Sequence, residues 1–296
     1  QEIFALNRFA TQHAGNYPLP RLAILTDEKV RLLRENTYDN VNILWRTSGV
    51  MPAIHYLSDL DNPEMPEYDA YVVWSPITIT AAQVTELKRR ASKTGKVLAI
   101  IGEVGTGSRD YANAAEALAQ FGLKITHHSG TTCEAVLPLA DTGDPLLEGV
   151  TGVLEMSGMC VAKQKLVHRY QYGFTDIDDP TATVLGKWER SGKPAFVRKP
   201  IGDGTLVYIA REGGVTPVVL NNLARMAGIK PHAAPGNATY VGNGVAAVHS
   251  LGAPVKIEFD RPVTLVDPVS QTRSEPVTVW TPSLQPGECA AIGYLP

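Results

Sequence analysis

The fold is decided by one stretch of sequence, Lys96-Val-Leu-Ala-Ile-Ile101, which is followed directly by Gly102-Glu-Val-Gly-Thr-Gly-Ser108. A short, continuous apolar run is typical of a strand that is buried on both faces, as in a parallel β-sheet. The glycine-rich segment behind it predicts a turn at the carboxyl end of that strand. The stretch therefore predicts an α/β protein whose functional loops lie at the carboxyl edge of a parallel sheet.

Similar runs recur on both sides of this stretch and alternate with helical patterns. Strands are predicted over Arg21–Thr26, Ala53–Leu57, Tyr71–Trp74 and Leu123–Thr126, and helices over residues 40–48, 81–93 and 112–120. In the second helix Thr80 is a suitable N-cap, and Val84 and Leu87 recur at helical spacing. Regular alternation of strand and helix predicts a doubly wound, flavodoxin-like sheet with helices on both faces.

The pattern changes after residue 150. β-rich segments are predicted over residues 152–156, 161–170, 182–188, 195–199 and 206–210, and a helix over Val218–Ala227 closes them. Short strand candidates bounded by glycine, proline or aspartate follow the turn-rich Pro231–Gly236, as in a small antiparallel β-sandwich. We therefore expect a helix and linker from an upstream region at 1–20, an α/β domain with a β-rich extension at 21–232, and a β-sandwich at 233–296.

Composition and charge exclude several classes of protein. With 27 basic and 30 acidic side chains the net charge is −3, and no basic stripe is available for nucleic acid. No apolar run approaches the roughly 20 residues that a membrane span requires, so a soluble chain is expected, either cytoplasmic or exported. Cys133, Cys160 and Cys289 are widely spaced and predict free thiols, and the scattered histidines predict no metal site and no other cofactor.

The glycine-rich loop at 102–108 is the first place to look for chemistry. It has neither the G-x-G-x-x-G order of a dinucleotide site nor the Gly-Lys-Ser/Thr of a phosphate-binding loop, so a flexible turn is the better interpretation. Class I glutamine amidotransferases and DJ-1-like proteins carry a nucleophilic cysteine just after such a strand, whereas Glu103 or a neighbour occupies that position here. Cys133, with His127 and His128 close in sequence, leaves a cysteine–histidine enzyme open as an alternative.

Hydrolysis of a glycosidic bond would require a pair of carboxylates across the sugar. Glu103 and Asp110 flank one loop and are candidates for that pair. Arg109 lies beside them, which favours a structural salt bridge or a solvated turn. We therefore predict no catalytic residue in this chain.

Sugar binding would require exposed aromatic faces. Trp74, Trp188 and Trp280 could stack on sugars, although aromatic residues within strand patterns are more often part of the core. We retain Trp74, Glu103 and Arg109 as candidate ligand-binding residues.

Several stretches, taken in order, resemble the region that follows the TIM barrel in glycoside hydrolase family 42 beta-galactosidases and related bacterial glycosidases. In the α/β part these are Leu25–Leu33, Arg46–Val50, Tyr56–Leu60, Pro63–Tyr71, Gly95–Leu98, Asp178–Gly186, Ser191–Ala195 and Gly202–Tyr208. Tyr240–His249 resembles the start of the terminal β domain of the same proteins. The resemblance extends from about residue 21 to the end of the chain, and the order of the motifs is more specific than any one of them.

This resemblance implies an amidotransferase-like domain that has lost its nucleophile and that commonly builds the subunit contacts of a trimer. It also implies that the catalytic glutamates lie on a TIM barrel of about 250 residues, which is absent from this chain. We therefore expect a non-catalytic accessory and oligomerisation region that works with a catalytic barrel, forms a homo-oligomer and contacts carbohydrate. The alternatives are an amidotransferase-like or DJ-1-like enzyme using Cys133, and a carbohydrate-binding module using the terminal sandwich or the 102–108 loop.

Overall fold

The computed structural model describes residues 2–13, 17, 19–29, 37–132, 134–140, 142–154, 171–211 and 213–296. Cys133, Cys160 and the strand predicted over residues 161–170 lie outside the described residues. No helix in the described ranges is long and apolar enough to cross a membrane.

The first of the two large sheets has eight strands in the order β2-β1-β3-β4-β10-β9-β8-β6. In chain order these are β1 (Leu22–Thr26), β2 (Pro52–Tyr56), β3 (Ala70–Trp74), β4 (Val97–Ile101), β6 (Val136–Pro138), β8 (Thr183–Trp188), β9 (Pro194–Ile201) and β10 (Gly204–Ile209). The strands from β2 to β10 in this order are parallel, and β9, β8 and β6 continue the sheet with antiparallel pairing. The four strands predicted up to Ile101 are therefore confirmed.

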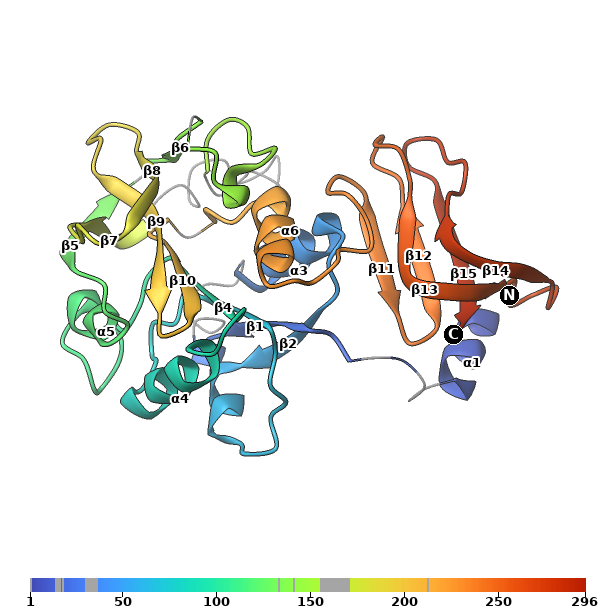
Figure 1. Cartoon of the computed structure of the whole chain (residues 1–296), viewed down its shortest axis with the longest axis horizontal. Helices are drawn as coiled ribbons and strands as arrows, with labels where there is room; N and C mark the ends of the chain where they lie inside the picture. Colours follow the sequence, from blue (N-terminus) through green and yellow to red (C-terminus); the bar gives the residue numbers. More distant parts are fainter. Residues whose placement is uncertain are drawn as a thin grey trace.

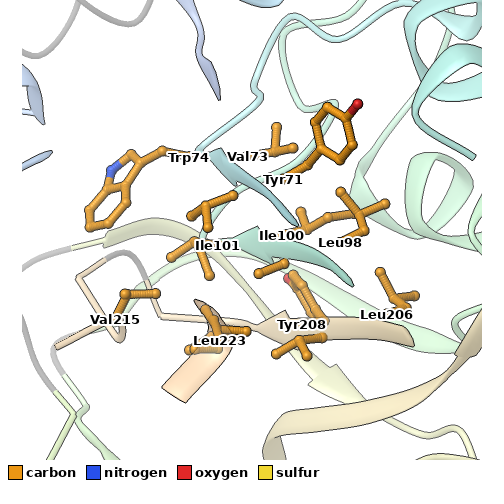
Figure 2. Close-up of a cluster of buried hydrophobic side chains, with 14 of the residues drawn as sticks. Tyr71, Val73, Trp74, Leu98, Ile100, Ile101, Leu206, Tyr208, Val215 and Leu223 are labelled. Atoms are coloured by element: carbon orange, nitrogen blue, oxygen red, sulfur yellow. The ribbon is translucent and has the colours of Figure 1, made fainter. Parts of the chain in front are cut away.

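Helices cover both faces of this sheet (Figure 1). They are α3 (Thr37–Ser48) and α6 (Pro217–Met226), which pack together on one face, and α4 (Ala81–Ala91) on the other, with α5 (Ala114–Gln120) at the side. Two short 3-10 helices, η1 (Leu57–Asp61) and η2 (Pro145–Leu147), complete the connections. Strands β1, β3 and β4 are buried at every position, as expected for central strands. Figure 2 shows side chains of β3 and β4 meeting Tyr208 of β10 and Leu223 of α6 in one apolar core.

The fifth parallel strand differs from the prediction. The segment after α5 forms β5 (Ile125–Thr132), which leaves the sheet and pairs with β7 (Gln171–Ile177) as a separate antiparallel ribbon. Its place beside β4 is taken by β10, which the sequence had assigned to the β-rich extension. The reason is polarity: β5 carries His127, His128 and other polar side chains, whereas β10 is almost fully buried, as a central strand must be.

The terminal part forms one antiparallel sheet of five strands in the order β11-β12-β15-β13-β14, so the predicted sandwich of two sheets is wrong for the described residues. The strands are β11 (Ala238–Gly242), β12 (Val245–His249), β13 (Ile257–Val266), β14 (Arg273–Trp280) and β15 (Cys289–Leu295). One face holds a small core around Phe259 and Tyr294. Helix α1 (Glu2–Gln12) lies on the other face, beside β15 (Figure 1), where a second sheet was expected.

A close junction joins the α/β part to the terminal sheet. Gly49 ends α3 with a φ of 76°, and a Cβ there would lie 2.0 Å from the carbonyl oxygen of Ala233. The buried amide of Asn221 on α6 donates to the carbonyl oxygens of Ser48 at 2.8 Å and Ala233 at 3.2 Å. Any residue with a Cβ would collide with the Ala233 carbonyl here, so the junction requires glycine at position 49.

Candidate functional site

The carboxyl ends of the parallel strands meet at one edge, where open α/β sheets bind their ligands. Asp27 follows β1 directly, Ser75 follows β3, Gly102 follows β4, and Arg211 lies two residues beyond β10. Asp27 is 3 % exposed, and its carboxylate accepts hydrogen bonds from the backbone N–H of Thr78 at 2.6 Å and from its hydroxyl at 3.0 Å. Asp27 therefore ties two loops of this edge together.

Gly102 occupies the turn directly after β4. Its φ is 78°, and its N–H donates to the carbonyl oxygen of Ile209 at 2.8 Å. In α/β-hydrolases, a strained turn directly after a strand is the position that exposes the nucleophile. The sequence placed Glu103 or a neighbour there, and the structure assigns the left-handed position to Gly102, which carries no nucleophilic group.

The loop behind Gly102 is fastened to its surroundings, which differs from the flexible turn expected from sequence. The N–H groups of Gly105 and Gly107 donate to the carbonyl oxygens of Pro76 and Ile77, each at 2.9 Å. The Ser108 hydroxyl donates to the carbonyl oxygen of Ile79 at 2.7 Å. The 102–108 loop is therefore a bound structural segment.

Glu103 belongs to a polar cluster beneath the β5–β7 ribbon. Its Oε1 accepts a hydrogen bond from the Thr106 hydroxyl at 2.6 Å. A Cβ placed on Gly173 would lie 3.2 Å from Cε1 of His127 and 3.4 Å from Oε1 of Glu103, so both side chains lie against this glycine. Burial lowers the pKa of His127, and this effect outweighs the opposing influence of the Glu103 carboxylate. The imidazole is therefore neutral near pH 7 and could accept a proton.

Tyr208 adds a phenol to the same cluster. Its hydroxyl bonds to the Thr175 hydroxyl at 2.8 Å and donates to the carbonyl oxygen of Gly102 at 3.3 Å. Burial raises the pKa of Tyr208, so the phenol stays protonated. Sequence reasoning missed Tyr208 and Thr175, because nothing in either strand pattern indicates that β7 lies over β10.

Ser75 is a second hydroxyl at this edge. It follows β3 with a φ of 42°, an unusual conformation for a residue other than glycine. The side chain is fully buried, and its Oγ has no hydrogen-bond partner within the described ranges. A serine nucleophile requires a base within hydrogen-bond reach. Ser75 therefore has the backbone of a nucleophile turn without the activating contact.

The three candidate ligand-binding residues lie in three different environments. Trp74 is 2 % exposed and packs in the core (Figure 2), with an indole N–H that has no partner among the described residues. Glu103 belongs to the polar cluster, and Arg109 lies on the exposed part of the loop. Ligand binding by these three residues stays a prediction.

The other residues considered from sequence have structural partners. The Asp110 carboxylate accepts a hydrogen bond from the N–H of Ala81 at 2.7 Å, at the start of α4. His128 contacts the Asp176 carboxylate at 3.0 Å and stacks on Phe174. The Trp188 indole is buried and donates to the carbonyl oxygen of Thr175 at 3.0 Å. Within the part of the chain that the structure describes, no three acidic, histidine or cysteine side chains are arranged to hold a metal ion.

Comparison with known proteins gives structural likeness without sequence likeness. No protein-family model and no curated protein matches the sequence. The fold is similar to that of the beta-galactosidase from Bacillus circulans sp. alkalophilus, with a TM-score of 0.59 and 14% identity over 92% of this chain and 41% of that one. Gan42B, a GH42 beta-galactosidase from G. stearothermophilus, gives 0.58 and 12% over 94% of this chain and 40% of its own. The beta-galactosidase from Marinomonas ef1 gives 0.58 and 15% over 99% and 41%.

These likenesses show a shared fold. This chain spans about two fifths of the length of the proteins that it resembles.

Proposed function

We propose that this chain is a non-catalytic accessory region of a larger glycoside hydrolase, of the kind represented by the GH42 beta-galactosidases. The observation that carries the proposal is Gly102, since the left-handed position after β4 has no side chain that could attack a substrate. The polar cluster nearby offers a carboxylate, a neutral imidazole and a protonated phenol, but the phenol is fully buried and the imidazole is held on β5, against Gly173 of β7. A scaffold that keeps the geometry of an enzyme without its nucleophile fits an accessory role.

The order of the parallel strands supports an amidotransferase-like ancestry for the first domain. Numbered along the parallel part alone, β2-β1-β3-β4-β10 has the order 2-1-3-4-5, which is that of flavodoxin-like folds. We therefore assign residues 21–232 to a flavodoxin-like domain and residues 233–296 to a terminal β domain. In such a protein the companion would be a catalytic TIM barrel, which would belong to the same or a separate chain.

The length of the structural neighbours supports this partnership. This chain matches 41% of the Bacillus circulans beta-galactosidase, so the larger part of that protein lies outside the matched region. We propose that the catalytic carboxylates act from such a region, and that this chain contributes subunit contacts in a homo-oligomer.

The test is an activity measurement on the chain by itself. We expect no hydrolysis of a nitrophenyl β-galactoside above the buffer rate, together with an oligomeric mass in sedimentation equilibrium. Hydrolysis that is lost in Glu103→Gln or Asp110→Asn, and kept in the exposed control Glu116→Gln, would contradict the proposal.

A further inference from the structure

The terminal sheet has one face that α1 covers only in part. Strand pairing places residues in rows across β11, β12 and β15, and directly opposed residues share a face. Gly242, Val245 and Gly293 form one row of this face, where a Cβ on Gly293 would lie 2.8 Å from the Phe9 ring of α1. The helix therefore covers this row at Gly293.

The next two rows continue past the edge of α1. They are Tyr240, Ala247 and Ala291, and then Ala238, His249 and Cys289. Along β15, Gly293 under the helix is buried, whereas Ala291 and Cys289 are exposed. Three of the six side chains in these two rows are alanine methyl groups. The two rows therefore form the floor of a shallow depression in the sheet surface.

Three other elements wall this floor and make it a groove of about 830 Å³. Leu6 of α1 lines the groove from one element, Trp45 and Arg46 of α3 from another, and Asp267 to Val269 of the β13–β14 turn from a third. A volume of this size is typical of small-molecule sites, which are mostly apolar with a few polar groups. We call this space the terminal groove.

The groove carries one fixed charge of each sign. The Arg46 guanidinium carbon lies 5.4 Å from the centroid of the Trp45 ring. The Asp267 carboxylate accepts hydrogen bonds from the N–H groups of Val269 at 2.8 Å and Ser270 at 3.0 Å. These backbone bonds lower the pKa of Asp267, so the carboxylate is ionised near neutral pH. The two charges balance, so the groove offers no net attraction to an anion or a cation, and a ligand without net charge fits it.

We infer that the terminal groove binds a short, neutral saccharide. The C–H faces of sugar rings match the methyl floor and the rings of Trp45 and Tyr240, and ring hydroxyls can donate to Asp267 and accept from Arg46. A second copy of the chain is a poorer occupant, because a broad protein surface does not enter a recess walled by three elements. The inference goes beyond the proposed function, since it concerns the face of the terminal sheet and no catalytic partner.

Binding is measured by calorimetry on the full chain with lactose, cellobiose and maltotriose as probes. We expect a dissociation constant of about 1 mM or lower for at least one of them. Ala291→Trp, which fills the groove from an exposed position, should weaken that binding by about tenfold or more. Thr278→Trp is the matched control, because it adds the same side chain at an exposed position of β14 outside the groove.

Cys289 gives a second readout, because its exposed thiol lies in the groove. The rate of modification by a thiol reagent, taken as the difference between the unchanged chain and Cys289→Ala, should fall several-fold at saturating saccharide. The inference is overturned if none of the three probes binds up to about 10 mM. It is also overturned if Ala291→Trp binds the saccharide as well as the unchanged chain does. If the chain binds no saccharide and Ala291→Trp abolishes its self-association, the groove holds a second copy of the chain instead. An inactive chain in the galactoside assay leaves all of these outcomes unaffected, so the two proposals fail separately.

Discussion

Asp179 illustrates how a single buried carboxylate holds the β-rich extension. Its side chain is 5 % exposed and contacts Lys199 Nζ at 2.7 Å, the Thr181 hydroxyl at 2.6 Å and the Thr181 N–H at 2.9 Å. Burial by itself would raise the pKa of Asp179, but the bonds from Lys199 and Thr181 outweigh it and lower the pKa to about 2. A carboxylate with a lowered pKa stabilises the fold above its ordinary pKa of 3.8, and that contribution is lost as pH falls through about 2.

We therefore expect Asp179→Asn to lower the free energy of unfolding by about 1–2 kcal/mol at pH 7. The difference from the unchanged chain should shrink as pH falls from about 4 to about 2. Urea denaturation at several pH values measures it, and Asp203→Asn, at an exposed position, is the control. A difference that stays constant down to pH 2 would contradict the role of the charge.

Replacing Tyr208 should lower the unfolding free energy through lost hydrogen bonds, without a change of charge. Tyr208→Phe removes the hydroxyl that bonds to Thr175 and to the carbonyl oxygen of Gly102. Because the site is fully buried, the groups left behind lose a partner, and we expect a loss of about 1–3 kcal/mol in unfolding free energy. Tyr240→Phe is the matched control, since its hydroxyl accepts a hydrogen bond from the Asn243 amide at an exposed site. An equal, small effect of both substitutions would argue against the buried cluster.

At the scale of elements, α6 depends on its first turn. Thr216 caps the helix by accepting from the N–H of Val219 at 3.3 Å, and Pro217 occupies the first helical position. Thr216→Ala should lower the unfolding free energy by about 1 kcal/mol. Thr85→Ala tests the same substitution at an exposed interior position of α4 and should cost less. The midpoint of urea unfolding compares the two variants.

The elements also show what the sequence could predict. The strands at 22–26, 70–74 and 97–101 were predicted because each is a continuous apolar run that is buried on both faces. The place of β10 beside β4 could not be predicted in this way, because the apolar pattern of residues 204–209 gives no information about which strand lies next to it. The polar side chains of β5 were visible, but an edge position in the main sheet and a separate ribbon fit them equally well.

The candidate site was predictable only in part. The sequence located the carboxyl edge of the sheet and the glycine-rich segment after Ile101, because both depend on local order along the chain. It did not reveal that His127 approaches Glu103 at Gly173, since the three residues lie on β5, in the loop after β4, and on β7. The burial of Trp74 agrees with its place in the apolar run 71–74, which favoured a core position.

At the scale of the whole molecule, the terminal sheet relies on residues from the other end of the chain. Its core includes Tyr17, whose hydroxyl donates to the carbonyl oxygen of Tyr294 at 2.7 Å, and Met51. Phe9 covers Gly293 on the opposite face. A sheet of this size buries little apolar surface of its own, so these residues supply a substantial share of its core.

We therefore expect a fragment of residues 233–296 to be largely unfolded. Circular dichroism and the dispersion of amide resonances measure this, with the full chain as the reference. Phe9→Ala in the full chain should lower the stability of the terminal sheet without changing the fluorescence of buried Trp74 and Trp188 at moderate urea concentrations. A well-folded fragment would contradict the dependence on α1, Tyr17 and Met51.

The position of α1 on β15 also determines how the molecule would respond to mechanical force. Helix α1 packs against strand β15, so tension applied between residues 1 and 296 acts first on the contact between these two elements. In an optical trap, the first rupture should release a short length of chain as α1 peels away, and the parallel strands should yield later at higher force. Detachment of α1 would thus precede unfolding of the parallel sheet and protect that sheet at low force.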